Sequence, residues 1–184
     1  MQSPCSGKPP NGVLPADRAR MADERQGRWR QMSAGDLAAV SAISDAVHGR
    51  YTEPMAVYAE RLNLYPAGCR VLEQDGEAAG YLISHPWFRE DPPKLGALLG
   101  AIPPDSDSYY LHDLALLPAA RGTGAGKAAL DFVKARARAR GRSDIALMAV
   151  GGADRYWARQ GFAYVPRDVD PSYGEGAYLM LGAI

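Results

Sequence analysis

The sequence predicts a mixed α/β (α+β) domain with a central sheet flanked by helices. Three observations favour this class. Short β-prone runs outnumber the helical ones, and Asp75-Gly76 joins two of those runs as a tight hairpin turn. Residues 109–140 have the pattern of a strand, a glycine-rich loop and a helix. A chain of 184 residues is long enough to bury one core, so we expect a single domain over residues 29–184.

The N-terminal region differs in composition from the rest of the chain. Residues 1–28 are rich in proline, glycine and charge and lack hydrophobic periodicity, which predicts a flexible N-terminal extension. Whether residues 1–20 belong to the natural protein is open, because Met21 is an alternative start. Ordered structure is expected from Trp29 onward.

Two helices are expected next. Ser33 as N-cap and Asp36 three residues later favour a helix start. Apolar residues then recur at roughly helical spacing, at Leu37, Val40 and Val47. A second short helix has Pro54 in its first turn. Its expected apolar face comprises Met55, Tyr58 and Leu62.

The remaining elements alternate between strands and helices. We expect a hairpin over 69–85, a proline-bounded connection over 91–108 with room for one helical turn, and a strand over 109–117. A helix over 123–140, ended by Gly141, precedes a buried strand over 144–150. The chain then ends with a short helix and two strands, over 153–160, 163–166 and 177–183.

Composition excludes several classes of function. Lys plus Arg (21) equals Asp plus Glu (21), so no global field attracts nucleic acid or a membrane surface. The basic run over 134–142 spreads its charge around a helix without aromatic interleaving, which favours a solvated face over a nucleic-acid site. Cys5 and Cys69 suit neither a disulfide nor a metal site. With no spanning apolar run and no secretory signal, we expect a cytoplasmic protein without metal.

The stretch RGTGAG, residues 121–126, stands between the predicted strand and helix and suggests an anion held by backbone amides. A nucleotide-binding P-loop is disfavoured, because Arg121 and Ala128 occupy positions that require Gly and Ser or Thr. A dinucleotide fingerprint is disfavoured too, because the spacing is G-x-G-x-G and the loop comes late in the chain. Neither nucleotide motif therefore explains the loop.

The spacing of Arg121, Gly124 and Gly126 instead resembles the acyl-CoA loop of the GNAT superfamily of N-acetyltransferases. The surrounding DLALLPAARGTGAGKAAL is similar to the strand–loop–helix unit of that family, and RYWARQGF resembles its second signature. The resemblance covers roughly residues 29–184. It implies the GNAT fold, in which a mixed, largely antiparallel twisted sheet has a splay between two parallel strands.

The resemblance implies acetyl-CoA as the acyl donor and assigns residues to it. The pantetheine arm inserts at the splay, against the main chain of Leu114, Ala115 and Leu116. The pyrophosphate binds the loop formed by Gly122, Thr123, Gly124, Ala125, Gly126 and Lys127. Arg121 either adds charge to the phosphates or is a solvated loop residue. Trp157 is expected to wall the arm.

The reaction implied is direct attack of an amine on the thioester, which requires a base and an acid. His112 is the candidate base, because imidazole titrates near neutrality; the alternative is a purely structural histidine. Strand alternation predicts that Tyr110, His112 and Leu114 share one face of the sheet and that Asp113 lies on the other. Asp113 is thus a catalytic candidate or only a structural partner.

The candidate acid departs from the family pattern. Trp157 stands where many members carry a tyrosine, and an indole cannot supply the proton. Tyr156, one residue earlier, is the candidate replacement; protonation by solvent is the alternative. Candidate acceptor contacts are Glu53, Tyr58, His85 and Trp87, with His48, Tyr51 and Tyr173 nearby.

These expectations define one leading function and one alternative. The first is an acyltransferase that acetylates a primary amine of a small molecule or peptide, with acetyl-CoA and the amine as its partners and no nucleic acid or membrane. The second is a catalytically silent acyl-CoA-binding module. The sequence leaves open the acceptor, the acyl chain length and whether the chain is a monomer or a homodimer.

Overall fold

The computed structural model describes residues 27–184, so residues 1–26 of the extension expected over residues 1–28 lie outside it. Seven strands form one sheet in the order β1-β2-β3-β4-β5-β7-β6. They are β1 (Arg28–Gln31), β2 (Cys69–Gln74), β3 (Glu77–Trp87), β4 (Ser108–Leu116), β5 (Asp144–Ala149), β6 (Phe162–Tyr164) and β7 (Tyr178–Ala183). Only β4 and β5 are parallel; all other neighbours are antiparallel. The predicted mixed, largely antiparallel sheet is confirmed.

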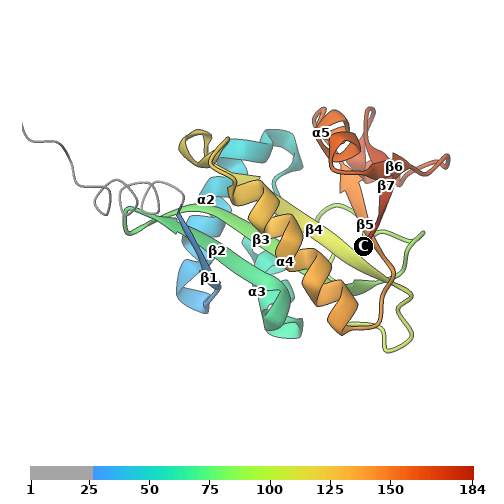
Figure 1. Cartoon of the computed structure of the whole chain (residues 1–184), viewed down its shortest axis with the longest axis horizontal. Helices are drawn as coiled ribbons and strands as arrows, with labels where there is room; N and C mark the ends of the chain where they lie inside the picture. The colour runs from blue at the N-terminus through green and yellow to red at the C-terminus, as the bar shows by residue number, and fades with distance from the viewer. Residues whose placement is uncertain (1–26) are drawn as a thin grey trace, which may run out of the picture.

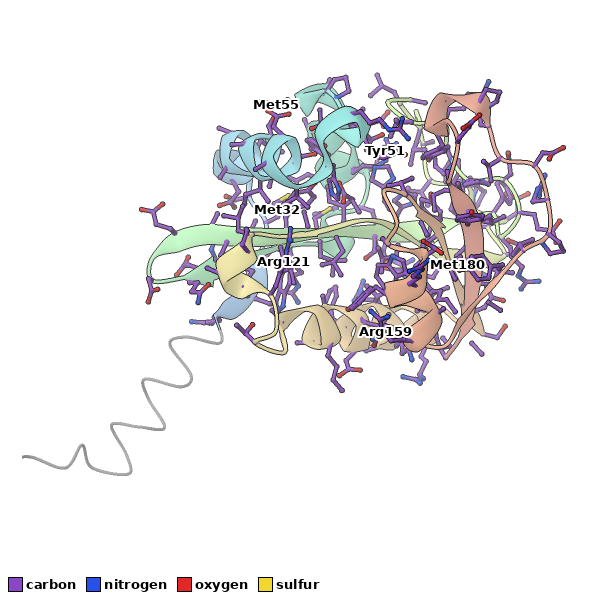
Figure 2. All side chains as sticks on the ribbon, turned by 90° about the horizontal axis from the view of Figure 1, so that it is seen from above. Met32, Tyr51, Met55, Arg121, Arg159 and Met180 are labelled. Atoms are coloured by element: carbon purple, nitrogen blue, oxygen red, sulfur yellow. The ribbon has the colours of Figure 1, made fainter. Side chains whose placement is uncertain are left out.

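Helices cover both faces of this sheet (Figure 1). On one face lie α2 (Leu37–His48) and α3 (Met55–Leu64), and on the other lie α4 (Ala125–Ala139) and α5 (Asp154–Arg159) (Figure 2). Each face has its own hydrophobic core. Val40, Ile43 and Tyr58 pack on Tyr81 and Ile83 under the first pair of helices. Leu130, Val133, Ala137 and Trp157 pack on Leu111 and Leu147 under the second pair.

Backbone geometry confirms two turns expected from the sequence. Asp75 and Gly76 both have positive φ angles, 52° and 81°, as a type I′ turn between β2 and β3 requires. At Gly141 the chain leaves α4 with φ 67°, where a side chain would be strained. These glycines therefore set where the hairpin turns and where the helix ends.

Three local expectations were wrong. The chain is extended already at Arg28 and forms β1, whose Trp29 donates a hydrogen bond of 3.1 Å from Nε1 to the Ala125 carbonyl. This long-range anchor has no local sequence signal. No helical turn occurs over 91–108. Met55 is 46% exposed, because α3 buries the adjacent stripe of Val57, Tyr58 and Arg61 instead. Among residues 27–184, no helix is long and apolar enough to cross a bilayer.

The sheet opens between its two parallel strands. The β4–β5 ladder contains only Tyr109 with Ile145 and Tyr110 with Ala146. Beyond these pairs both strands continue without further pairing, β4 to Leu116 and β5 to Ala149. One edge of β4 therefore carries main-chain groups that β5 does not bind.

Candidate functional site

The glycine loop connects the end of β4 to the start of α4. Gly122 and Gly124 have φ angles of 75° and 94°, a conformation that side chains other than glycine rarely adopt. Gly124 is the N-cap of α4, so the unpaired amides of the first helical turn lie beside the loop. These amides, with the positive end of the helix dipole, form an environment that favours an anion.

Side chains of the loop contact the protein itself, and one of them, Thr123, also accepts a long hydrogen bond of 3.4 Å from the Ala125 amide through Oγ1. Arg121 donates from Nε to the Leu116 carbonyl at 3.0 Å, and Thr123 donates to the Ala120 carbonyl at 2.8 Å. Figure 2 shows Arg121 at the level of the sheet. Lys127 is 76% exposed and its ammonium lies 2.5 Å from the Asp131 carboxylate. The anion-binding capacity expected of the loop over residues 121–127 therefore comes mainly from its main chain.

Tyr156 and Trp157 lie on the α4 side of the opening. A Cβ atom built on Gly126 would stand 3.0 Å from the Tyr156 hydroxyl and 3.7 Å from the Leu116 side chain, so Tyr156 reaches the loop end of β4. Burial raises the pKa of Tyr156. The Trp157 side chain is buried in the core and packs edge-on against Phe162.

A β-bulge interrupts β4 at the candidate base. Ile83 of β3 pairs with Asp113, whereas the next residue, Ser84, pairs with Leu111. His112 is therefore an extra residue that faces no partner across the ladder. The bulge changes which face each later side chain occupies.

The expected alternation along β4 was wrong for this reason. Tyr110 and His112 do share the α2–α3 face, with ring centroids 6.1 Å apart. Asp113 also lies on this face, as its hydrogen bonds with His48 and Tyr81 show. Leu114 packs into the opposite core against α4. The bulge thus brings an imidazole and a carboxylate from adjacent positions to one face.

His112 forms a buried pair with Glu53. Nε2 of His112 lies 2.8 Å from Oε2 of Glu53, and the two side chains are 4% and 6% exposed. The Gly96 amide donates to the other carboxylate oxygen at 2.7 Å. Burial raises the pKa of Glu53, but the charge and hydrogen bond of His112 outweigh it and leave this pKa below its ordinary value. Nδ1 of His112 is buried and has no hydrogen-bond partner within residues 27–184.

Asp113 forms a second pair with His48, at the end of α2. Nε2 of His48 lies 2.8 Å from Oδ1 of Asp113, and the Tyr81 hydroxyl donates to Oδ2 at 2.5 Å. Burial lowers the pKa of His48, but the charge and hydrogen bond of Asp113 raise it above the ordinary value. Burial raises the pKa of Asp113, and His48 with Tyr81 brings it below the ordinary value. Both partners therefore favour their charged forms.

Several predicted acceptor contacts lie behind these pairs. Tyr58 is fully buried, and its hydroxyl accepts from the Glu53 amide at 3.0 Å and contacts Ser44 at 2.6 Å. His85 is 1% exposed and packs on His112 with centroids 5.8 Å apart; burial holds its pKa well below the ordinary value. Tyr58 thus contacts the Glu53 main chain and His85 contacts the His112 ring, both on the buried side of the His112–Glu53 pair. Their contact with an acceptor stays a prediction.

The aromatic residues at the surface of the site have separate positions. The Trp87 indole donates to the Asp91 carbonyl at 2.7 Å and stacks edge-on against His85. Tyr51, labelled in Figure 2, lies in the connector between α2 and α3, and its ring is 3.7 Å from a Cβ atom built on Gly151. Because Gly151 follows β5, this connector reaches across the opening of the sheet.

Other chemistry considered from the sequence has a structural explanation. In α4, Arg136 donates to the Tyr65 hydroxyl at 3.1 Å and Arg140 lies over the same ring. Cys69 is a buried free cysteine whose thiol donates to the Tyr65 carbonyl at 3.6 Å, and burial raises its pKa to about 12; Cys5 lies outside the described residues. Within residues 27–184 no cluster of three or more His, Cys, Asp or Glu side chains could hold a metal ion.

Sequence reasoning named His112, Asp113 and Glu53 as candidates but did not predict how they pair. The two pairs join residues far apart in the chain, and the local pattern contains no signal for the bulge. One chemical signal could have suggested the pairing. Each of two segments contains one histidine and one acid, His48 and Glu53 in the first and His112 and Asp113 in the second, so each histidine has an acid available in the other segment.

The sheet opens between its two parallel strands, and a glycine loop precedes α4 at the end of β4, which is the arrangement that the GNAT resemblance implied. A family model described as the acetyltransferase (GNAT) family matches residues 37–162, and the chain belongs to this family. No curated protein matches the sequence significantly.

Solved structures share the fold at low sequence identity. The GphF GNAT-like decarboxylase, solved with isobutyryl-CoA, has a TM-score of 0.70 at 21% identity, over 85% of this chain and 98% of that chain. The loading GNATL domain of CurA from Lyngbya majuscula has a TM-score of 0.70 at 14% identity, over 85% and 96%. The ribosomal-protein-S18-alanine N-acetyltransferase from Escherichia coli has a TM-score of 0.60 at 19% identity, over 86% and 94%.

Proposed function

We propose that this protein transfers an acetyl group from acetyl-CoA to a primary amine of a small molecule or peptide. The observation that carries the proposal is the His112–Glu53 pair, which lies beside the unpaired edge of β4. A base is needed there, because an amine must lose a proton to attack a thioester. The isobutyryl-CoA complex of the similar GphF structure supports a CoA thioester as a ligand of this fold.

The residues divide the work of the reaction between them. The Gly122–Lys127 loop would hold the pyrophosphate, and the main chain of Leu114–Leu116 would bind the pantetheine arm and polarise the thioester carbonyl. The amine nitrogen forms a bond to the carbonyl carbon, the carbon–sulfur bond breaks, and the electron pair of that bond stays on the CoA sulfur. His112 takes the amine proton directly or through water, while Glu53 stabilises the resulting imidazolium.

The charge around the acceptor side supports a cationic substrate. A cavity of about 310 Å³ lies between the loops that follow β3 and β6. Its lining includes four carboxylates and two cations: Glu90, Asp91, Asp168, Asp170, Lys94 and Arg167. The loop after β3 is also the one whose Gly96 amide binds Glu53. A protonated amine would therefore meet excess negative charge on its approach.

A thiol-release assay tests this function. The protein is mixed with acetyl-CoA and a panel of amines that includes polyamines, aromatic amines and short peptides, and free CoA is measured with a thiol-reactive dye. We expect amine-dependent release from the wild-type protein and a much lower rate of release from the H112A variant. If CoA raises the melting temperature but no amine releases thiol, the protein is an acyl-CoA-binding module and the proposal is wrong.

A further inference from the structure

The bulge brings two neighbouring residues of β4 against the end of α2 and the connector that follows it, and the two pairs have opposite chemical order. His112 meets the carboxylate of Glu53, whereas Asp113 meets the imidazole of His48. The first pair is closed, with exposures of 4% and 6%, while His48 in the second pair is 19% exposed. Paired titratable groups in different environments are the arrangement by which enzymes separate a base from an acid.

The surroundings of His48 favour its protonated form. It is in the last turn of α2, where the helix dipole stabilises a cation. The charged and titratable groups that act on it are Asp113 of β4, Glu53 of the connector and Arg121 of the glycine loop, with Tyr81 of β3 bound to the same Asp113. Arg121 opposes protonation, and the two carboxylates outweigh it and burial, so the pKa of His48 is raised.

The position of His48 places it at the opening of the sheet. The connector that follows His48 carries Tyr51 to within 3.7 Å of a Cβ atom built on Gly151, beyond the end of β5. Arg50 in the same connector donates to the Glu175 carbonyl at 3.4 Å. Within residues 27–184 the Nδ1 atom of His48 has no hydrogen bond, so this nitrogen is available to a bound molecule.

Tyr156 lies at the other end of the opening. Its hydroxyl is near Gly126 and Leu116, three residues along β4 from Asp113. At about 3.3 Å per strand residue this separation is roughly 10 Å. Tyr156 therefore approaches the loop end of the open edge, while the bulge carries the acid–base pairs.

We propose that His48, held by Asp113 and Tyr81, is the group that protonates the departing CoA thiolate. This inference rests on the proposed acetyl transfer. As the carbon–sulfur bond breaks, the sulfur takes the proton of the His48 imidazolium and CoA leaves as the thiol. The proton that His112 removed from the amine remains on the first pair until solvent accepts it, and solvent reprotonates His48. No oxidant or further reactant is needed.

The test compares the pH dependence of two variants in the thiol-release assay. An acid must be protonated, so wild-type kcat falls as pH rises through the raised pKa of His48. H48Q keeps a donor to Asp113 but has no acidic proton. We therefore expect kcat to fall about 100-fold, and we expect the fall of kcat at high pH, the basic limb of the pH profile, to disappear. Y156F is expected to keep the basic limb.

Two further measurements separate chemistry from folding. Imidazole added to H48A should restore thiol release, which a structural role would not allow. D113N should move the basic limb to lower pH, because it removes the charge that raises the pKa of His48. A basic limb lost in Y156F and kept in H48Q overturns the inference. A wild-type protein without amine-dependent thiol release overturns the proposed function, and this inference with it.

Discussion

The two halves of the proposed site use different groups, main-chain amides in the donor half and side chains in the acceptor half. The donor half of the proposed site is a contiguous loop of the chain in which glycine backbone and helix amides would bind CoA, while the side chains contact the protein. The acceptor half consists of side chains from α2, the connector and β4, paired and mostly buried. The difference teaches that a main-chain site is encoded by a short motif, whereas a side-chain site depends on the register of distant elements.

The largest effect is expected at the backbone of the donor half. G124E should abolish measurable CoA binding, because it strains a residue with φ 94° and puts a negative charge where the pyrophosphate would lie. G141E is the matched control, since Gly141 is also left-handed (φ 67°) but ends the opposite end of α4. Isothermal titration with CoA checks both variants. Equal affinities in G124E and G141E would remove the anion role of the loop.

A smaller effect is expected from one charge in the acceptor half. E53Q retains an acceptor for the Gly96 amide but loses the charge that stabilises protonated His112, so kcat should fall about 100-fold while CoA affinity is kept. Glu60 holds the amides of Leu99 and Gly100 in the same loop without touching His112. E60Q is therefore the control for loop displacement. Steady-state kinetics that show the same loss in both variants would contradict a role for Glu53 in proton transfer.

The smallest effect is expected at a donor-half side chain. K127A should weaken CoA binding only about two- to fivefold, because the ammonium is exposed and already paired with Asp131. The same titration measures it. A loss as large as that of G124E would show that side-chain charge, and not the backbone, dominates the donor half.

This contrast also explains what the sequence could predict. The hairpin at Asp75-Gly76, the order of elements and the glycine loop follow from residues adjacent in the chain, and the structure has the hairpin turn and the element order. Strand β1 was missed because its stability comes from pairing with β2 and from Trp29 reaching α4. The face of Asp113 was wrong because alternation assumes a regular ladder, and a bulge is decided by the partner strand.

The bulge at His112 divides β4 into two phases. Before it, the odd-numbered Tyr109 and Leu111 face α4; after it, the even-numbered Leu114 does. Removing His112 would restore a single phase, in which Leu111, Asp113 and Leu114 alternate regularly, so Asp113 would keep its face and the His112–Glu53 pair would be lost. A one-codon insertion or deletion can therefore create or erase the double pair in evolution, a change that no scan of single substitutions samples. An alignment with a chain that lacks the extra residue must open its gap at this position.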